Sequence, residues 1–539
     1  MRTFFLMLSF AGAILGTGLG HLSADAPSAH QTATPIKHLV VIFQENVSFD
    51  HYFGSYPNAL NPQGEPSFHA MPGTPTVNGL TDALLSHNPN LNPDNGKGAA
   101  NPFRLDRSQA FTADMEHEYT PEQQAFDGGL MDLFPSNTGN AGPPPNAAGG
   151  AANTSGLVMG FFDGNTVTAL WNYAQRYAMS DNSFGTTFGP STVGAINLVS
   201  GQTNGVIKYI NGTGDLIQGG NGSFTMIGDP DPLNDVCSDP ASDQAQLGSQ
   251  NIGDLLNQSG VTWGWFAGGF NLNLLNPDGS TGCKRQSKSA ITGLHADYIP
   301  HHQPFQYYAS TANPTHAHPS SLGAIGKSGD AANHQYDIND FFAAVEAGNF
   351  PAVSFLKAIA IQDGHAGNSD PLDEQAFVVH VINFLQKQPE WRNTAVVVLY
   401  DDSDGWYDHQ IGPIINSSRT PADALTGPRA CGTGIASLPG IDSANTHAQG
   451  RCGYGPRQPM LIISPWARHN FVDHAVTDQT SIARFIEDNW LEGRRIGQGS
   501  FDGLANSINQ MFDFTQAPTN DKFILNPDTG ELVSSPSSN

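Results

Sequence analysis

The chain has 539 residues, of which 38% are hydrophobic, so we expect a sizeable core and not a globally disordered protein. Its formal net charge of −26 at pH 7 argues against nucleic acid or an anionic membrane surface as a tight partner, because both favour clustered Lys and Arg. Only 13% of the residues are charged, which suits a protein that works in acid, where carboxylates are partly neutralised.

The first residues have the pattern of an export signal. Arg2 precedes an apolar stretch from Phe4 to Leu19, and Ala24-Asp25-Ala26 matches a cleavage site. We therefore predict a signal peptide over residues 1–26 and a periplasmic or secreted mature protein. No later stretch has the roughly 18 continuous apolar residues that a membrane helix needs, so no membrane span is expected.

The run from Leu39 to Phe43 is rich in β-branched residues, which predicts a strand buried on both faces of a parallel sheet. Such strands deliver their next residues to the carboxyl edge of the sheet, where open α/β sheets bind ligands. Glu45 and Asn46 follow at that edge, and their oxygens could hold a hard divalent cation. The alternative is that Glu45 and Asn46 only begin a loop and cap the following turn.

A polar stretch rich in Pro and Gly follows, from residue 58 to about 153. It indicates either an ordered excursion over the site or a flexible insertion. Regular structure resumes where Leu170, Tyr173, Ala174 and Tyr177 recur at helical spacing.

Strand-like and helical runs then alternate. The strand-like runs are VTWGWFAGGF, AVSFLKAIA and NTAVVVLYDDSDG, and the helical ones include Asp337 to Ala347 and Asp373 to Lys387. This alternation predicts an α/β fold with a mostly parallel sheet, flanking helices and loop-rich insertions. We expect a single domain over residues 27–515, with insertions at about 58–153 and 205–330, and a peripheral tail over residues 516–539.

The chain has four cysteines, which suits an oxidising compartment. They allow three connectivities, of which we predict the pairing of nearest neighbours, Cys237 with Cys283 and Cys431 with Cys452. Free buried thiols are the alternative. Their wide and irregular spacing gives no zinc-site pattern.

A second apolar run, Val396 to Leu399, leads into Asp401 and Asp402. Adjacent carboxylates at the end of a buried strand repel each other unless a positive charge lies near them, and a bound metal ion would supply that charge. The alternative is an Asp-rich turn whose side chains bond their own backbone. If both strands belong to one sheet, Glu45 and Asn46 meet these carboxylates at the same edge.

The stretch FGPSTVGAINLVSG presents hydroxyl groups before a predicted helix, whose start we expect in the run from Ala195 to Val199. Backbone N–H groups and the helix dipole favour a phosphate dianion at such a position. Ser191 or Thr192 could then be a nucleophile that a metal ion activates. The alternative is that this residue only caps the helix.

Three motifs, ENVSFDHYFG, FGPSTVGAINLVSG and YDDSDGWYDH, occur in this order at wide separations. In these motifs the chain resembles the bacterial phosphoesterase family of phospholipases C and respiratory-burst-inhibiting acid phosphatases, a branch of the alkaline phosphatase superfamily. The resemblance extends from about Ile36 to Trp490 and implies an alkaline-phosphatase-like core. One departure is Val193, where similar proteins usually have Pro.

The resemblance also implies residue roles. Ser191 would be the nucleophile, and one divalent metal ion would be bound by Glu45, Asn46, Asp401 and Asp402. These oxygen ligands favour Mg²⁺, Ca²⁺ or Mn²⁺, and Zn²⁺ remains an alternative.

Three further segments resemble those that bring active-site histidines to phosphate in the acid phosphatase branch. They contain His117, His302 and His365. A histidine can stabilise phosphoryl oxygens or protonate the leaving alcohol. Asp363 and Asp370 either orient His365 or cap loops.

Together these residues predict an exported, metal-dependent phosphoric ester hydrolase. The favoured interpretation is a broad-specificity acid phosphatase that works through a phosphoseryl intermediate on small phosphate esters. One alternative is a phospholipase C that cleaves phosphatidylcholine-type phospholipids, with Trp263, Trp265, Phe266 and Tyr407 able to cage a choline cation. Another is a non-catalytic binding scaffold. The oligomeric state is left open.

Overall fold

The computed structural model describes residues 31–142, 150–416, 418–425, 430–431, 448–519 and 521–533. The predicted signal peptide, residues 1–26, lies outside this part of the chain. Thr32–Asn539 groups into one compact unit, which is the unit described below. None of the described helices combines the length and apolar character that crossing a bilayer requires.

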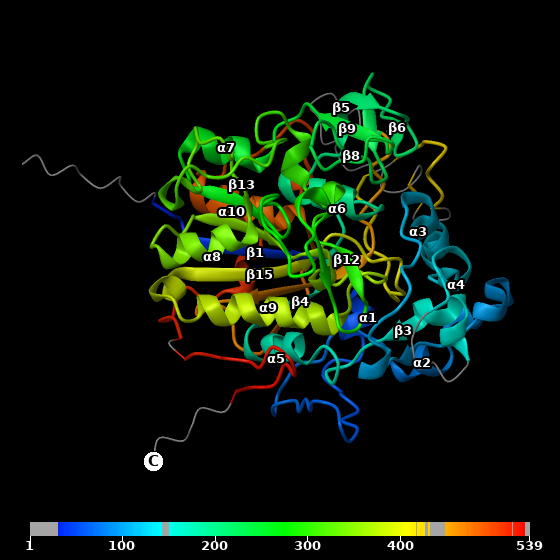
Figure 1. Ribbon diagram of the computed structural model, residues 1–539. Coiled ribbons are helices and arrows are strands. Elements are labelled where there is room, and N and C mark those ends of the chain that lie inside the picture. Colours follow the sequence, from blue (N-terminus) through cyan, green and yellow to red (C-terminus); the bar gives the residue numbers. More distant parts are fainter. Residues whose placement is uncertain are drawn as a thin grey trace, which may run out of the picture. The chain divides into compact units, whose positions relative to one another are not determined.

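A large sheet organises the fold. In the described part of the chain its order is β13-β10-β14-β1-β15-β16-β4-β17, with β18 beside β4 (Figure 1). The strands are β13 (Gln335–Asp337), β10 (Trp263–Ala267), β14 (Val353–Lys357), β1 (His38–Gln44), β15 (Thr394–Tyr400), β16 (Arg457–Ile463), β4 (Ala178–Phe184), β17 (Phe471–Asp473) and β18 (Thr477–Asp478). Neighbours pair in parallel except β16, which is antiparallel to both β15 and β4. The predicted α/β fold with a mostly parallel sheet is confirmed.

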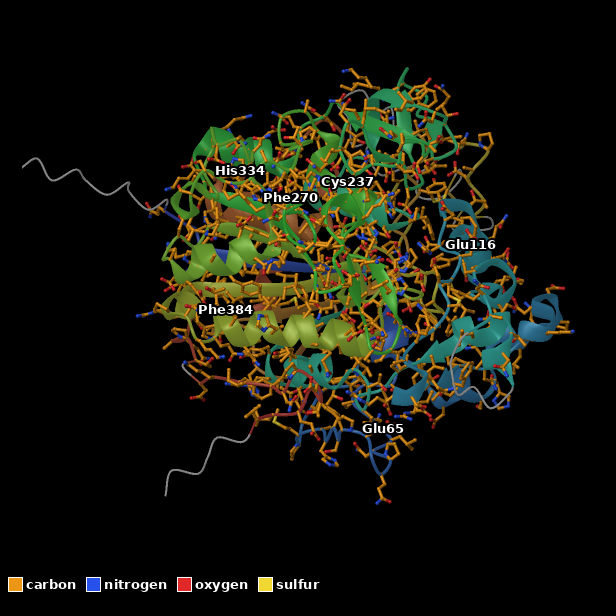
Figure 2. All side chains as sticks on the ribbon, in the orientation of Figure 1. Glu65, Glu116, Cys237, Phe270, His334 and Phe384 are labelled. Atoms are coloured by element: carbon orange, nitrogen blue, oxygen red, sulfur yellow. A yellow bond between two sulfur atoms is a disulfide. The ribbon has the colours of Figure 1, made fainter. Side chains whose placement is uncertain are left out.

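Helices cover both faces of this sheet, and side chains fill the layers between (Figures 1 and 2). One face carries α5 (Thr168–Arg176), α8 (Ile338–Glu346) and α9 (Pro371–Leu385), and the other carries α6 (Ser191–Ser200), α7 (Ile252–Ser259) and α10 (Thr480–Trp490). On β1, Val40 and Ile42 belong to the first buried cluster, and Val41 and Phe43 to the second. This two-sided burial explains why the strand is apolar at every position.

Smaller elements lie in the excursions from the sheet. Those before β4 are α1 (Phe49–Phe53), α2 (Asp82–Ser86), β2 (Phe103–Arg104), α3 (Tyr119–Phe126), α4 (Phe134–Asn137) and β3 (Gly160–Phe161). A second sheet, in the order β6-β7-β5-β9-β8, consists of β5 (Asn204–Ile210), β6 (Leu216–Gln218), β7 (Phe224–Met226), β8 (Asp231–Pro232) and β9 (Gln244–Leu247). The strands β11 (Gln286–Lys288) and β12 (Leu294–Ala296) form an antiparallel pair.

The helix that we expected to start near Ala195 begins earlier. Ser191 is its first residue and Pro190 is its N-cap, so the interpretation of Ser191 as only a cap is wrong. The backbone N–H of Val193 donates a hydrogen bond to the Pro190 carbonyl at 2.9 Å, which a proline at position 193 could not make.

The helical spacing predicted a helix that includes Tyr177, which is one residue too many. The helix α5 ends at Arg176, and the chain turns into strand β4 at Ala178. The sequence of β4, AMSDNSF, contains no β-branched residue, so propensity does not mark it as a strand. Its pairing with β16, β17 and β18 determines its structure instead.

Both disulfides join nearest neighbours in sequence, Cys237 with Cys283 and Cys431 with Cys452. The predicted pairing is therefore confirmed. The first bond ties the loop after β8 to the segment before β11, where Figure 2 marks Cys237. Such bonds persist in oxidising compartments, which agrees with the predicted export.

Two segments lie deeper in the fold than the predicted domain boundaries suggest. The strand β10 belongs to the central sheet, although it falls within the predicted insertion at 205–330. In the predicted tail, Leu525 is 1% exposed, and its carbonyl accepts a hydrogen bond from Asn383 of α9 at 2.7 Å. This part of the tail therefore packs against α9.

Candidate active site

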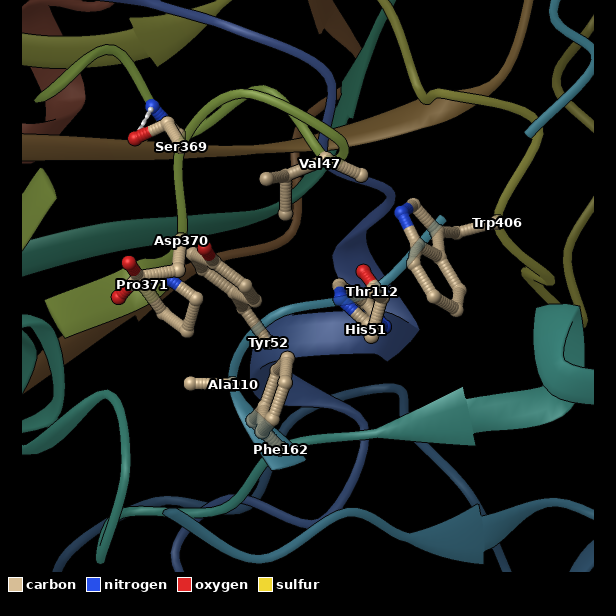
Figure 3. A pocket seen from close by; sticks show the side chains of 12 residues that line it. Val47, His51, Tyr52, Ala110, Thr112, Phe162, Ser369, Asp370, Pro371 and Trp406 are labelled. Atoms are coloured by element: carbon tan, nitrogen blue, oxygen red, sulfur yellow. Dashed lines mark hydrogen bonds between the residues drawn. The ribbon is translucent and has the colours of Figure 1, made fainter. Parts of the chain in front are cut away.

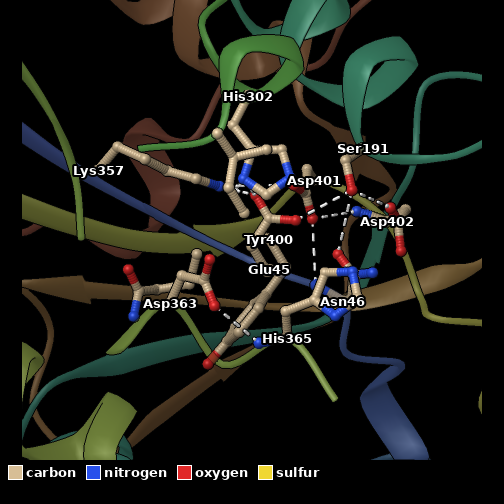
Figure 4. A network of polar contacts seen from close by, with 12 residues as sticks. Glu45, Asn46, Ser191, His302, Lys357, Asp363, His365, Tyr400, Asp401 and Asp402 are labelled. Atoms are coloured by element: carbon tan, nitrogen blue, oxygen red, sulfur yellow. Dashed lines mark hydrogen bonds and ion pairs between the residues drawn. The ribbon is translucent and has the colours of Figure 1, made fainter. Parts of the chain in front are cut away.

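The carboxyl ends of β1 and β15 bring the predicted metal ligands together (Figure 4). The two strands pair in parallel with Gln44 opposite Tyr400, so the residues that follow leave the sheet side by side. Each of those residues is at most 2% exposed, and they are Glu45, Asn46, Asp401 and Asp402. The edge predicted from the two apolar strands therefore exists.

The hydroxyl group of Ser191 lies among these oxygens. Its Oγ is 2.9 Å from Glu45 Oε2, 3.1 Å from Asp402 Oδ2 and 3.3 Å from Asn46 Oδ1. One hydroxyl hydrogen serves only one acceptor, so the remaining oxygens face each other with no hydrogen between them. Asp401 Oδ2 is buried and finds no hydrogen-bond partner among the described residues. This crowding of oxygens fits a hard divalent cation.

The helix α6 approaches the ligands closely enough to require glycine. A Cβ atom at Gly194 would lie 2.0 Å from the backbone oxygen of Asp401. Before the helix, Gly189 has a φ of +121°, which L side chains rarely adopt. These two glycines allow Ser191 to stand at the positive end of the helix dipole, beside the ligands.

Asn46 is held in a left-handed backbone conformation, with a φ of +56°. Residues other than glycine adopt it at a cost, and such strain collects at functional sites. With its amide reversed, Asn46 donates to Glu45 Oε2 at 2.8 Å and accepts from His365 Nε2 at 3.2 Å. A cation between the ligands would instead select the orientation that turns Oδ1 toward Ser191.

Burial makes the ionisation of this cluster costly. It raises the pKa of Asp401 well above its ordinary value, with help from the charge of Glu45, and it raises the pKa of Asp402 to about 6. Burial acts in the same sense on Glu45, but contacts with His302 and Lys357 outweigh it and hold the pKa of Glu45 well below its ordinary value. Full ionisation of the cluster therefore calls for added positive charge.

The three predicted histidines surround the same point. His302 Nδ1 lies 2.9 Å from Glu45 Oε1, and burial lowers the pKa of His302 to about 3. The rings of His302 and His365 are stacked with centroids 6.4 Å apart, and the His117 ring meets the His365 ring edge-on at 5.9 Å.

His117 is paired with a buried carboxylate that the sequence did not single out. Its Nδ1 lies 3.4 Å from Asp404 Oδ1 and 2.8 Å from the Met115 carbonyl. Burial acts to lower the pKa of His117, but the charges of Asp402 and Asp404 outweigh it and raise this pKa well above its ordinary value.

The aspartates near His365 have different partners. Asp363 Oδ1 accepts the backbone N–H of His365 at 3.0 Å, so it holds that loop. Asp370 is the N-cap of α9 and accepts the N–H groups of Leu372 and Asp373. The interpretation of Asp370 as a cap is confirmed.

The aromatic residues that could have caged a choline cation are core residues. Trp263 and Trp265 pack on one face of the central sheet, whereas Phe266 and Tyr407 belong to the cluster on the other face. Each is at most 4% exposed. They cannot form one cage, so this interpretation is wrong.

A small cavity lies beside the loops of the site, between α1 and the segment that leads into α9 (Figure 3). Its volume is about 10 Å³, which has room for about one water molecule. This cavity is therefore too small to hold a phosphate ester. A larger hollow of about 660 Å³ is lined by residues from Gly54 to Asp163, and none of the predicted site residues lines it.

Sequence reasoning missed Glu122, a buried carboxyl group on α3. Its Oε2 accepts the N–H of Gly189 at 3.1 Å, and its Oε1 accepts the hydroxyl of Ser403 at 2.7 Å. Glu122 therefore ties the loop before Ser191 to the loop after Asp402. Burial and the charge of Asp402 raise the pKa of Glu122 to about 8, so at neutral pH the group is largely uncharged.

We expect Glu122→Ala to lower kcat by about 10- to 100-fold with little change in KM, because it loosens two loops that position reacting groups. Glu122→Gln should stay within about fivefold of wild type, since the amide oxygen can accept the Gly189 N–H and the amide nitrogen can donate to the Ser403 hydroxyl. Steady-state kinetics on both variants checks this, with Gln124→Ala, an exposed position on the same helix, as the control. Equal kcat values for the Ala and Gln variants would contradict the role of Glu122 in joining the two loops.

A family model described as Phosphoesterase family matches residues 36–491. The chain is 24% identical over 475 residues to the Non-hemolytic phospholipase C of Burkholderia pseudomallei (strain K96243), a match that covers 86% of this chain and 56% of that protein. It is 23% identical over 495 residues to Phospholipase C A of Mycobacterium tuberculosis (strain ATCC 25618 / H37Rv), covering 90% of this chain and 78% of that protein.

Against the Non-hemolytic phospholipases C of Burkholderia pseudomallei and Pseudomonas aeruginosa, the chain spans 56% and 62% of their lengths. Among solved structures, a protein in the alkaline phosphatase superfamily from Vibrio parahaemolyticus matches at 12% identity with a TM-score of 0.27, over 61% of this chain and 60% of that chain. Because the family model spans most of the sequence, the chain belongs to the Phosphoesterase family.

Proposed function

We propose that this protein is an exported, metal-dependent phosphoric ester hydrolase of the phospholipase C type, which cleaves a phosphatidylcholine-like phosphodiester. The relatives named phospholipase C support this substrate class over the broad acid phosphatase that the sequence alone favoured. The observation that carries the chemistry is Ser191 Oγ, at the start of a buried helix and within 3.1 Å of two carboxylates. A scaffold without catalysis would not need this arrangement.

In this proposal, Glu45, Asn46, Asp401 and Asp402 hold one divalent cation. When bound, the cation lowers the pKa of the Ser191 hydroxyl and polarises a phosphoryl oxygen. Ser191 Oγ passes its proton to Asp402 Oδ2, 3.1 Å away, and attacks phosphorus. The bond from phosphorus to the glycerol oxygen breaks, and this oxygen takes a proton from His365 as diacylglycerol leaves. Water then attacks the phosphorus of the intermediate, which still carries the headgroup, and gives a proton to His302. The bond to Ser191 breaks, Ser191 Oγ takes back the proton from Asp402, and the phosphorylated headgroup leaves. Charge stabilisation dominates such a reaction.

The histidines have distinct parts in this proposal. His302 Nδ1 faces a carboxylate oxygen, so it carries the hydrogen and leaves Nε2 as the basic nitrogen that takes a proton from the attacking water. In this proposal the His117 ring stabilises the phosphoryl oxygens. The Nδ1–H of His365 donates a hydrogen bond to the Ala366 carbonyl. In the protonated ring, the Nε2–H then gives its proton to the leaving glycerol oxygen.

The test compares p-nitrophenylphosphorylcholine with p-nitrophenyl phosphate, each with and without chelator. We expect the diester to turn over at least about 10-fold faster by kcat/KM, with both rates lost in chelator and restored by a divalent cation. Faster turnover of p-nitrophenyl phosphate would instead favour the acid phosphatase. If neither substrate is hydrolysed with any divalent cation tested, the result would favour the binding scaffold.

A further inference from the structure

Lys357 ends β14 inside the cluster of predicted metal ligands, and the proposed chemistry gives it no part. Its side chain is 2% exposed. Its ammonium forms an ion pair with Glu45 Oε1 and lies 3.6 Å from Asp401 Oδ2. The ammonium also lies 5.2 Å from the centre of the Phe43 ring on the neighbouring strand. Figure 4 shows Lys357 reaching Glu45 from the side away from Ser191.

The two carboxylate oxygens of Glu45 face different groups. Its Oε2 faces the Ser191 hydroxyl, where the divalent cation of the proposed function would lie. Its Oε1 faces the Lys357 ammonium and, at 2.9 Å, His302 Nδ1. The lysine is therefore on the opposite edge of a carboxylate that it shares with the metal ion.

The charges of the site need this second cation. The carboxylates of Glu45, Asp401 and Asp402 carry three negative charges when ionised, and a divalent cation neutralises two. The remaining negative charge would repel an anionic phosphoryl group in a site with little water to screen it. The ammonium of Lys357 removes this excess.

A second metal ion could in principle do the same. Glu45, His302 and Asp363 offer ligand atoms that all lie within 4.8 Å of one another. However, the oxygen that Glu45 would give to such an ion is Oε1, and Lys357 is already paired with it. The lysine therefore takes the position that a second metal ion bound through Glu45 would need.

We infer that Lys357 supplies the fixed positive charge that a second metal ion would otherwise bring, so that the site binds a single cation and still accepts an anionic phosphoryl group. This inference rests on the proposed function, because it takes Glu45 and Asp401 as metal ligands. Its test uses binding alone and requires no turnover.

The experiment measures Mn²⁺ binding by electron paramagnetic resonance and inorganic phosphate binding by calorimetry, the latter at saturating Mn²⁺. Wild type should bind one Mn²⁺ per chain. We expect Lys357→Met to bind Mn²⁺ at least about 10-fold more tightly and phosphate at least about 10-fold more weakly. The substitution removes one positive charge, which repels Mn²⁺ and attracts phosphate. Lys357→Arg should stay near wild type, and Lys327→Met, at an exposed lysine, is the matched control.

The opposite signs of the two changes separate a charge effect from structural damage, which would weaken both. Lys357→Gln provides a second neutral variant if Lys357→Met does not fold. Two Mn²⁺ ions per wild-type chain, or any other combination of changes in the neutral variants, would overturn the inference. A wild-type protein that binds one Mn²⁺ and phosphate but hydrolyses no ester would refute the proposed function and leave the role of Lys357 standing.

Discussion

Ser191→Ala is expected to lower kcat for phosphodiester hydrolysis by at least about 1,000-fold, because it removes the attacking atom and the covalent route with it. Binding of Mn²⁺ should change much less, since Glu45, Asp401 and Asp402 remain. Steady-state kinetics with p-nitrophenylphosphorylcholine measures the loss. Acid quenching of the wild-type reaction, followed by peptide mass spectrometry, should find a phosphorylcholine group on Ser191.

The matched control is Thr192→Ala, one position further along the same helix turn. The Thr192 hydroxyl donates to the His301 carbonyl at 3.2 Å, and its backbone N–H donates to Asp229 Oδ1 at 2.8 Å. Neither contact involves a predicted metal ligand, so we expect a loss within about tenfold. Equal losses in the two variants, or a Ser191→Ala rate near wild type, would refute the assignment of Ser191 as nucleophile.

The sequence was most informative where one strand is buried on both faces. The apolar runs that became β1 and β15 could only lie in the middle of a sheet, and parallel strands bring their carboxyl ends to one edge. Glu45 and Asp401 could therefore be placed together although they are far apart in sequence. By contrast, the polar strand β4 carries no such signal, because its neighbours in the sheet determine its structure.

The supporting residues of the site were harder to predict. Glu122 contacts Gly189 and Ser403 only because the excursion after β1 folds back over the site. No local sequence pattern predicts these contacts. Lys357 did carry a signal, since a lysine that directly ends an apolar strand such as VSFLK must find a partner for its charge if it is buried. Its partner, Glu45, directly follows the neighbouring strand β1, and strand order cannot be read from the sequence of β14 alone.

Asp402→Asn is expected to lower kcat/KM by about 100-fold or more at limiting metal, because it removes charge from a predicted ligand while its shape remains. Asp402 Oδ2 lies 3.1 Å from Ser191 Oγ, and Oδ1 accepts the backbone N–H of Asp404 at 2.7 Å. An asparagine keeps the second contact through its own carbonyl oxygen, so the loop geometry is preserved. Kinetics over a Mn²⁺ titration measures the loss, and excess metal should restore part of the activity.

The same substitution should have the opposite effect on the stability of the metal-free protein. Burial raises the pKa of Asp402 to about 6, above its value in an unfolded chain, so the folded state binds its proton more tightly. Stability from this group is present at low pH and is lost as the pH rises toward about 6, where the buried carboxylate ionises. In chelator at pH 8, Asp402→Asn should therefore melt at a higher temperature than wild type, and at pH 5 the difference should shrink.

Saturating Mn²⁺ should reverse the order of the two melting temperatures, because only wild type offers the full charge to the cation. If the variant were less active and also less stable in chelator at pH 8, Asp402 would be holding the loop and not a metal ion.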